Sequence, residues 1–368
     1  FAVAGNGNYK TQNSIINITD GELISTADYA VYLPQSGTTT ISGGKVYGAA
    51  GGVCIQRGTL NVEGTALITS KGTGSTGNWG DGTGGLDCAA INVSGAYGIA
   101  TVNIKGGTLI AEAKSLITEG TTYTPVINVT GGTFSDPSVL KYMATNATVD
   151  IKLLSNINIA KTELATGYIL NAANATANLN LNGHDIINSS ETADATPFTQ
   201  IFTVQNGTLN ISGNGNVKCD ASATAKDDGY RMVIEARGYG TVNIHGGSYY
   251  NTQKLNTQID LIYARENGKI NIYGGTFESG KYGTPNNDTD GRYWVLNLKN
   301  TDKNTASIQV SGGTFINFNP ANPNMDDNES YLVTGYEVTR DGSVYTAAHK
   351  VGDGRKEYIV GQTSQENR

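Results

Sequence analysis

The 368-residue sequence contains little cysteine, proline or charge. Its three cysteines, Cys54, Cys88 and Cys219, are too few and too far apart for a disulfide framework or a zinc site, and the odd number leaves at least one free thiol. Charged residues make up only 15% of the chain, which argues against disorder. No apolar run approaches the ~18 residues of a membrane span, so we expect no membrane insertion in this segment.

The charge balance is acidic, with 25 Lys and Arg against 32 Asp and Glu and a net charge of −7. Such a chain lacks the basic surface that neutralises a phosphate backbone, so nucleic acid is excluded as an expected partner. The sequence begins at Phe1, in the middle of a pattern and without an initiator Met or a signal peptide. We therefore expect it to be a processed piece of a longer protein.

Glycine is abundant, at 48 residues, and it punctuates an internal repeat. The core of the repeat is an aliphatic residue, Asn and a second aliphatic residue, commonly followed by Gly-Gly and then Thr-Leu, Thr-Phe or Ser-Tyr. The cores are Ile16–Ile18, Leu60–Val62, Ile91–Val93, Val102–Ile104, Ile127–Val129, Leu179–Leu181, Leu209–Ile211, Val242–Ile244 and Ile270–Ile272, with Ile308–Val310 as a Gln variant. A constant core with connections of variable length is typical of a solenoid.

Side chains alternate within each core, so its aliphatic residues face one side of a strand and its Asn faces the other. The cores lie too far apart for simple hairpins, which predicts parallel stacking, with the aliphatic residues inside and Asn outside. Phe134, Phe277 and Phe315, each two residues after a corner glycine, should be interior. The only helical turns expected are at Pro137–Met143 and Lys161–Tyr168. The predicted fold is all-β, a parallel β-helix.

The Gly-Gly-Thr-Phe cores, such as Gly131–Phe134, resemble the right-handed parallel β-helix modules of large surface proteins of gut bacteria and their phages. Residues 1–7 and 30–35 resemble the first module of that family. Residues 312–315, with Asn319-Pro320 after them, resemble its closing module. The resemblance implies a right-handed β-helix. It leaves function open, because the family includes stalks, adhesins, fibres and some polysaccharide-degrading enzymes.

The repeat lapses around residues 135–147, which suggests a boundary there. We predict a first β-helix module over residues 1–145 and a second over 146–330. The remainder, 331–368, is predicted to be a capping hairpin and a polar tail. The hairpin is indicated by the Asp341-Gly342 turn between Tyr336–Val338 and Val344-Tyr345.

One segment has the oxygen donors of a calcium loop. Asn286, Asp288 and Asp290 alternate and are followed by Gly291, like the front half of a Ca²⁺-binding loop. The Glu expected at the twelfth position is replaced by Asn297, and a solvated Asn- and Asp-rich turn is the alternative. Calcium is therefore a possible ligand, and we expect no other cofactor.

Aromatic and basic residues in the second module form a candidate ligand site: Tyr249, Tyr263, Tyr293, Trp294, Arg237 and Arg265. Aromatic side chains suit sugar stacking, but they are also ordinary strand residues. The two arginines occupy equivalent repeat positions near Glu235 and Glu266. Such an arrangement occurs in a polysaccharide lyase site, and the alternative is a pair of surface arginines whose charge the glutamates neutralise. We assign no catalytic residue, because His184, His245 and His349 are scattered and no nucleophile motif accompanies them.

These features favour a non-enzymatic extracellular stalk or adhesin-like scaffold that binds glycans or other host or bacterial surface components. A phage fibre or capsid-decorating protein is the first alternative, and it would imply a trimer and a virion surface. A polysaccharide lyase or depolymerase is the second. Whether the chain is an enzyme stays open, although the lack of an assigned catalytic residue argues against it.

Overall fold

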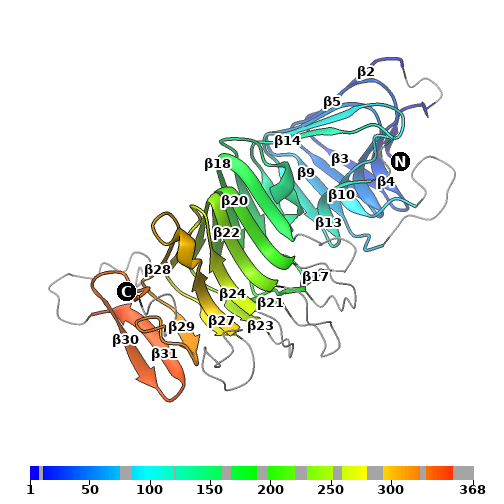
Figure 1. Cartoon of the computed structure of the whole chain (residues 1–368). Helices are drawn as coiled ribbons and strands as arrows, with labels where there is room; N and C mark the ends of the chain where they lie inside the picture. The colour runs from blue at the N-terminus through cyan, green and yellow to red at the C-terminus, as the bar shows by residue number, and fades with distance from the viewer. Residues whose placement is uncertain are drawn as a thin grey trace, which may run out of the picture.

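The computed structural model describes residues 1–7, 11–74, 85–119, 122–159, 167–188, 198–219, 230–251, 259–279, 293–323 and 329–350. Figure 1 shows an elongated stack of strands with the first circuits at one end and a hairpin at the other. We call one successive set of strands, one from each sheet, a circuit. Most strands pair in parallel with the equivalent strands of the preceding and following circuits. Within the described residues, antiparallel pairing occurs where the closing hairpin folds and joins the stack. The fold is all-β with long parallel sheets, as predicted.

Three sheets surround the N-terminal part of the stack. Sheet A contains β1 (Val3–Ala4), β4 (Tyr29–Leu33), β7 (Gly51–Ile55), β10 (Ala89–Val93) and β13 (Lys114–Thr118). Sheet B contains β2 (Ser14–Ile18), β5 (Gly37–Ile41), β8 (Gly58–Val62), β11 (Ala100–Ile104) and β14 (Val126–Val129). Sheet C starts with β3 (Glu22–Ser25), β6 (Lys45–Gly48), β9 (Leu67–Ser70), β12 (Thr108–Ala111) and β15 (Thr133–Phe134).

Two sheets form the C-terminal part. Sheet C continues through β16 (Thr148–Lys152), β18 (Tyr168–Asn180), β20 (Phe198–Ser212), β22 (Tyr230–Ile244), β24 (Ile259–Ala264) and β27 (Tyr293–Leu298), with β25 (Lys269–Ile272) and β28 (Ser307–Val310) on a branch. Sheet D contains β17 (Ile157–Ile159), β19 (Ile186–Asn188), β21 (Asn216–Cys219), β23 (Ser248–Asn251), β26 (Thr276–Ser279), β29 (Thr314–Ile316), β31 (Val344–His349) and β30 (Tyr336–Asp341).

The repeat cores have the side-chain orientation that the sequence predicts. In β11, Val102 and Ile104 are fully buried, and Asn103 between them reaches the surface. The Asn side chains then bond to one another from circuit to circuit, each Nδ2 donating to the preceding circuit. One such ladder joins Thr40, Asn61, Asn103 and Asn128, and a second joins Asp150, Asn178, Asn210, Asn243 and Asn271. The donor–acceptor distances within these two ladders are 2.8–3.4 Å.

Asn92 is an exception and corrects our interpretation of the core at Ile91–Val93. This core lies in sheet A, and Asn92 is fully buried. Its Nδ2 donates to the Asp87 carbonyl oxygen at 3.1 Å and to Glu119 Oε2 at 2.6 Å. The residues match the repeat, but the segment occupies a different side of the stack.

Aromatic rings fill the C-terminal end of the interior. Phe134, Phe277 and Phe315 are buried, as predicted. The Phe277 ring stacks on Phe315 at 5.0 Å beside Gly313, whose φ of +100° supplies the left-handed corner that glycine favours. The hairpin β30–β31 pairs with β29 and ends the stack, which confirms the predicted hairpin.

The arrangement of the strands changes between the two parts of the stack. A 3₁₀ helix, η2 (Pro137–Tyr142), follows β15, as predicted for this segment; a second, η3 (Asn300–Asp302), follows β27. β15, a Thr-Phe strand, pairs with β16. On its other side β16 pairs with β18, where Asp150 lies opposite Asn178 at the start of the second ladder. The predicted boundary at 145/146 falls at this change and stays a prediction. Of the second predicted helical segment, residues 161–166 lie outside the described part, and Tyr168 begins β18 rather than ending a helix.

Candidate functional site

The strands that precede the Asn cores in the C-terminal part carry a local irregularity. In β22, Val233, Ile234 and Ala236 belong to the interior cluster, whereas Met232 and Glu235 do not. Simple alternation would place residues three apart on opposite faces, so the alternation is interrupted between Met232 and Glu235, at the adjacent interior residues Val233 and Ile234. Met232 and Glu235 both lie outside the interior cluster. The same division between interior and outer positions recurs in β20, β24 and β27.

Parallel pairing aligns these outer positions into two columns. The first column is Gln200, Met232, Asp260 and Trp294, and the second is Thr203, Glu235, Tyr263 and Asn297. No residue type occurs twice in either column, whereas the Asn ladder further along the same strands is nearly uniform. Long connections lead into these strands, and insertions on one side of a solenoid often build its binding face. We therefore take these columns as the candidate site.

A buried carboxylate lies at the centre of the site. The Glu235 side chain is 2% exposed, and Oε1 accepts a hydrogen bond from Arg265 Nε at 2.6 Å. Its Oε2 accepts longer bonds from Gln200 Nε2 and Thr203 Oγ1, both at 3.4 Å. A charge this deep needs a partner, and the guanidinium supplies it.

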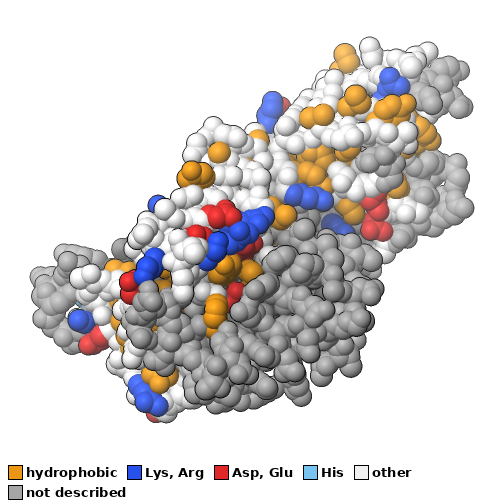
Figure 2. Space-filling view, in the orientation of Figure 1, with side chains coloured by type: hydrophobic (Ala, Val, Ile, Leu, Met, Phe, Trp, Pro, Cys, Tyr) orange, Lys and Arg blue, Asp and Glu red, His pale blue; other side chains and the backbone are white. Residues whose placement is uncertain are grey.

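Both predicted arginines lie beside this carboxylate. Arg265 also binds Glu266 through Nη1 at 2.6 Å. Burial lowers the pKa of Arg265, but the hydrogen bond to Glu235 and the charges of both glutamates outweigh burial, so the pKa is raised above its ordinary value. Arg237 is further away, with Nε 4.0 Å from Glu235 Oε2, and its side chain is 32% exposed. Figure 2 shows basic and acidic side chains gathered over the middle of the molecule, where β22 and β24 lie in Figure 1.

The neighbouring positions add hydrogen-bonding groups. Asp260 is almost fully buried, and its Oδ1 accepts a bond from Asn297 Nδ2 at 2.9 Å. Burial and then the charge of Asp260 raise the pKa of the Tyr263 hydroxyl to about 12, so it remains a protonated donor at neutral pH. The site thus offers a neutral hydroxyl next to paired charges.

Trp294 is paired with Asp260 in register and is partly exposed. Its Nε1–H is buried and has no hydrogen-bond partner in the described part of the chain. A buried indole N–H usually finds an acceptor. The side chain therefore combines a partly accessible apolar ring with an unused donor.

The structure brings together four of the six predicted ligand residues on one outer face: Arg237, Arg265, Tyr263 and Trp294. The prediction was wrong for Tyr249. Its ring is fully buried, stacks on Phe277 at 5.1 Å, and its hydroxyl donates to the Gly246 carbonyl. The side chain of Tyr293 and the calcium candidates Asn286, Asp288 and Asp290 lie outside the described residues.

Sequence reasoning missed Gln200, Thr203, Asp260 and Asn297. A signal was present, because Val233–Arg237 aligns with Leu261–Arg265, and both segments contain two adjacent aliphatic residues flanked by polar or large ones. Two adjacent interior residues interrupt the strand alternation, and the positions that flank them then lie outside the interior.

Within the described residues, no group of three or more His, Cys, Asp or Glu side chains is placed to hold a metal ion. Nor does any described helix have the length and hydropathy needed to cross a membrane. No family model, curated protein or solved structure matches the chain.

Proposed function

We propose that the chain is a right-handed parallel β-helix that acts as a non-enzymatic scaffold outside the cell or on a virion, and that the outer columns of β20, β22, β24 and β27 bind a glycan. The observation that carries this proposal is the contrast between the columns and the Asn ladder on β20 and β22. The ladder repeats one residue type, whereas each position of a column carries a different side chain.

The chemistry of this face suits a sugar. Carbohydrate sites combine an apolar platform with a few oriented polar groups. Trp294 offers a partly exposed ring, while Tyr263 adds a hydroxyl. Of the eight column positions, Tyr263 and Trp294 are partly exposed and the other six are buried. A sugar would therefore contact these two side chains, on neighbouring strands ~4.8 Å apart, together with the partly exposed Arg237 and Arg265.

The same geometry argues against the lyase or depolymerase alternative at this site. Acid–base catalysis needs a carboxylate that reaches the substrate and exchanges a proton with it. Glu235 is buried and bonded to Arg265 at 2.6 Å, and Asp260 is bonded to Asn297. These carboxylates favour positioning over catalysis. A phage fibre would use the same scaffold as a trimer. The mass of the protein in solution tests this alternative.

The test is a glycan array probed with the wild-type chain, with and without Ca²⁺. Trp294→Ala should abolish binding while leaving the unfolding transition in place. Tyr123→Ala is the matched control, because Tyr123 is a large exposed residue (47%) in the N-terminal part of the stack. It should bind like wild type.

Absence of binding by the wild-type chain to any glycan under either condition would overturn the glycan assignment and leave a plain scaffold. Equal binding by wild type and Trp294→Ala would move the ligand away from these columns. Release of oligosaccharides from an array polymer would restore the enzyme alternative.

A further inference from the structure

Sheet B ends abruptly at β14. Its strands follow the order β14-β11-β8-β5-β2, and no described strand pairs with the other edge of β14. The contacts there come from η2 and the residues that follow it: Val129 forms a bridge with Met143, and Ala144 donates its N–H to the Val129 carbonyl at 2.9 Å. The next circuit does not refill this side, because β16 pairs with β15 of sheet C instead. No described strand therefore occupies the position after β14, and η2 contacts β14 there instead.

The empty position leaves interior and ladder groups without their usual neighbour. Leu60 and Val102 are fully buried, but Ile127, in register with them, is only partly buried. Asn128 ends the first ladder: its Nδ2 donates to Asn103 Oδ1 at 3.0 Å, and no described side chain donates to its own Oδ1.

Part of the β14 backbone, at Ile127, is also available for pairing. In a parallel ladder, alternate residues direct both backbone groups to the same neighbour. The Val129 carbonyl faces away from β11, toward Ala144. Ile127, two residues earlier, therefore directs its N–H and C=O to the same open edge.

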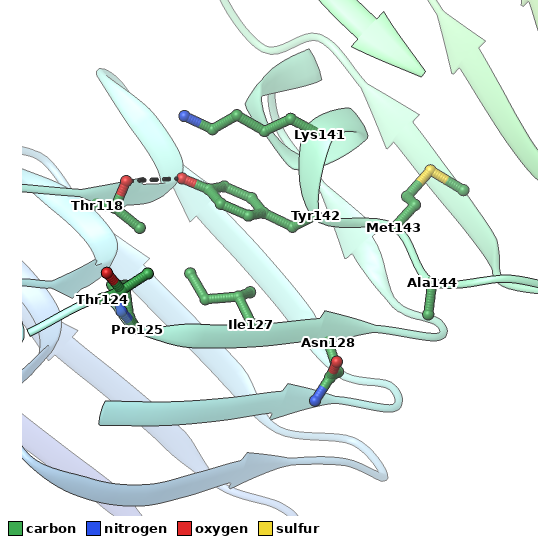
Figure 3. A pocket seen from close by; sticks show the side chains of 9 residues that line it. All are labelled: Thr118, Thr124, Pro125, Ile127, Asn128, Lys141, Tyr142, Met143 and Ala144. Carbon is green, nitrogen blue, oxygen red and sulfur yellow. Dashed lines mark hydrogen bonds between the residues drawn. The ribbon is translucent and has the colours of Figure 1, made fainter. Parts of the chain in front are cut away.

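A pocket of about 490 Å³ occupies this place. Figure 3 shows the Ile127 side chain pointing from β14 toward the Tyr142 ring. The Tyr142 hydroxyl forms a hydrogen bond with the Thr118 hydroxyl, with 3.1 Å between the two oxygens. The Lys141 ammonium lies 4.7 Å from the centre of that ring and extends toward the side where Thr118 and Thr124 lie. Lys141 is the one charged residue among those that line the pocket.

We propose that this pocket accepts an extended polypeptide segment of a partner as a further parallel strand on β14. Strand addition to an open sheet edge gains affinity from main-chain hydrogen bonds and specificity from alternate side chains. An aliphatic residue opposite Ile127 would close the interior. An Asn opposite Asn128 would continue the ladder, since Asn128 Oδ1 is the acceptor that such a residue needs. An acidic residue near the N-terminal end of the segment would meet Lys141.

The probe is an acetylated peptide, Glu-Gly-Thr-Val-Asn-amide, with Val placed opposite Ile127. In that register the peptide Asn N–H donates to the Ile127 carbonyl, whereas the Val N–H points away from β14. Binding to the full chain is measured by saturation-transfer NMR, and protection of the Ile127 amide is measured by hydrogen exchange. The wild-type chain should bind the peptide, and exchange at Ile127 should slow.

N-methylation of the peptide Asn should weaken binding at least about fivefold, because it removes one main-chain hydrogen bond and adds a clash. N-methylation of Val, the matched control, should leave binding unchanged. Lys141→Glu should weaken binding about two- to fivefold at low salt and should favour a peptide with Lys in place of Glu. Absence of binding, no protection at Ile127, or equal loss from the two methylations would overturn the proposal.

Discussion

Arg265 and Glu235 form a charged contact on the outer face of sheet C, with Nε 2.6 Å from Oε1, that links neighbouring circuits. The carboxylate is buried, while the guanidinium remains one-quarter exposed. The pair is thus asymmetric: loss of the arginine leaves a buried charge, and loss of the glutamate leaves a cation that can reach water.

This asymmetry predicts unequal effects of substitution. Arg265→Gln should lower the free energy of unfolding by about 2–4 kcal/mol, because the Glu235 charge then lies buried without its partner. Glu235→Gln should cost less, about 1–2 kcal/mol. The double variant should recover most of the loss of Arg265→Gln. Urea denaturation measures all three, and a fully additive double variant would contradict the coupling.

Alkaline pH should destabilise the chain through Tyr263. Its folded-state pKa is raised to about 12, above the ~10 of an unfolded tyrosine, so its stabilising contribution is complete below pH ~10 and is lost as the pH rises through 12. Tyr263→Phe should show a shallower fall of stability over that window. Tyrosinate absorbance during a pH titration provides the measurement, and an identical pH profile for both proteins would refute the assignment.

The aromatic column in the interior predicts a large packing effect. Phe277 lies between Tyr249 and Phe315 and is fully buried. Phe277→Ala should cost ~3–5 kcal/mol. Tyr273→Ala serves as the control, because that ring is 50% exposed, and should cost under ~1 kcal/mol. A loss below ~1 kcal/mol for Phe277→Ala would contradict its interior position.

The second ladder predicts that Asp is tolerated at one end only. Asp150 accepts a bond from Asn178 Nδ2 at 3.0 Å, so a carboxylate serves there, and Asp150→Asn should change stability by less than ~0.5 kcal/mol. Asn243 must donate to Asn210 and accept from Asn271. Asn243→Asp should cost about 1–3 kcal/mol at neutral pH and less below pH ~4, where the acid regains a donor. Equal effects at both positions would refute the ladder's direction.

The features predictable from sequence are those with strictly local causes. Two-residue alternation and glycine corners fix the outward Asn and the buried Phe277, and both recur in every circuit of the same kind. The interior position of Tyr249 was also predictable from the repeat. Ser248-Tyr249 is equivalent to Thr276-Phe277, with which it pairs in register, so the ring of Tyr249 should be buried like that of Phe277.

The features that escaped prediction depend on which circuits become neighbours. Asn92 has the residue pattern of a ladder position, yet its segment lies in sheet A, where the outer face is covered. The pairing of β15 with β16 is likewise a choice of partner between strands, and single-strand patterns do not encode it. The cluster at Glu235 combines side chains from separate circuits, which the strand register brings within hydrogen-bonding distance.

The amide ladders also have a direction, since each Asn Nδ2 donates to the circuit before it. A finished circuit therefore presents an unfilled acceptor on the side from which the next segment arrives. Chain synthesis proceeds in the same direction, from the N-terminus. Each newly made circuit can thus be templated by the one already folded, and the stack can grow by addition at a single advancing face, without waiting for the rest of the chain.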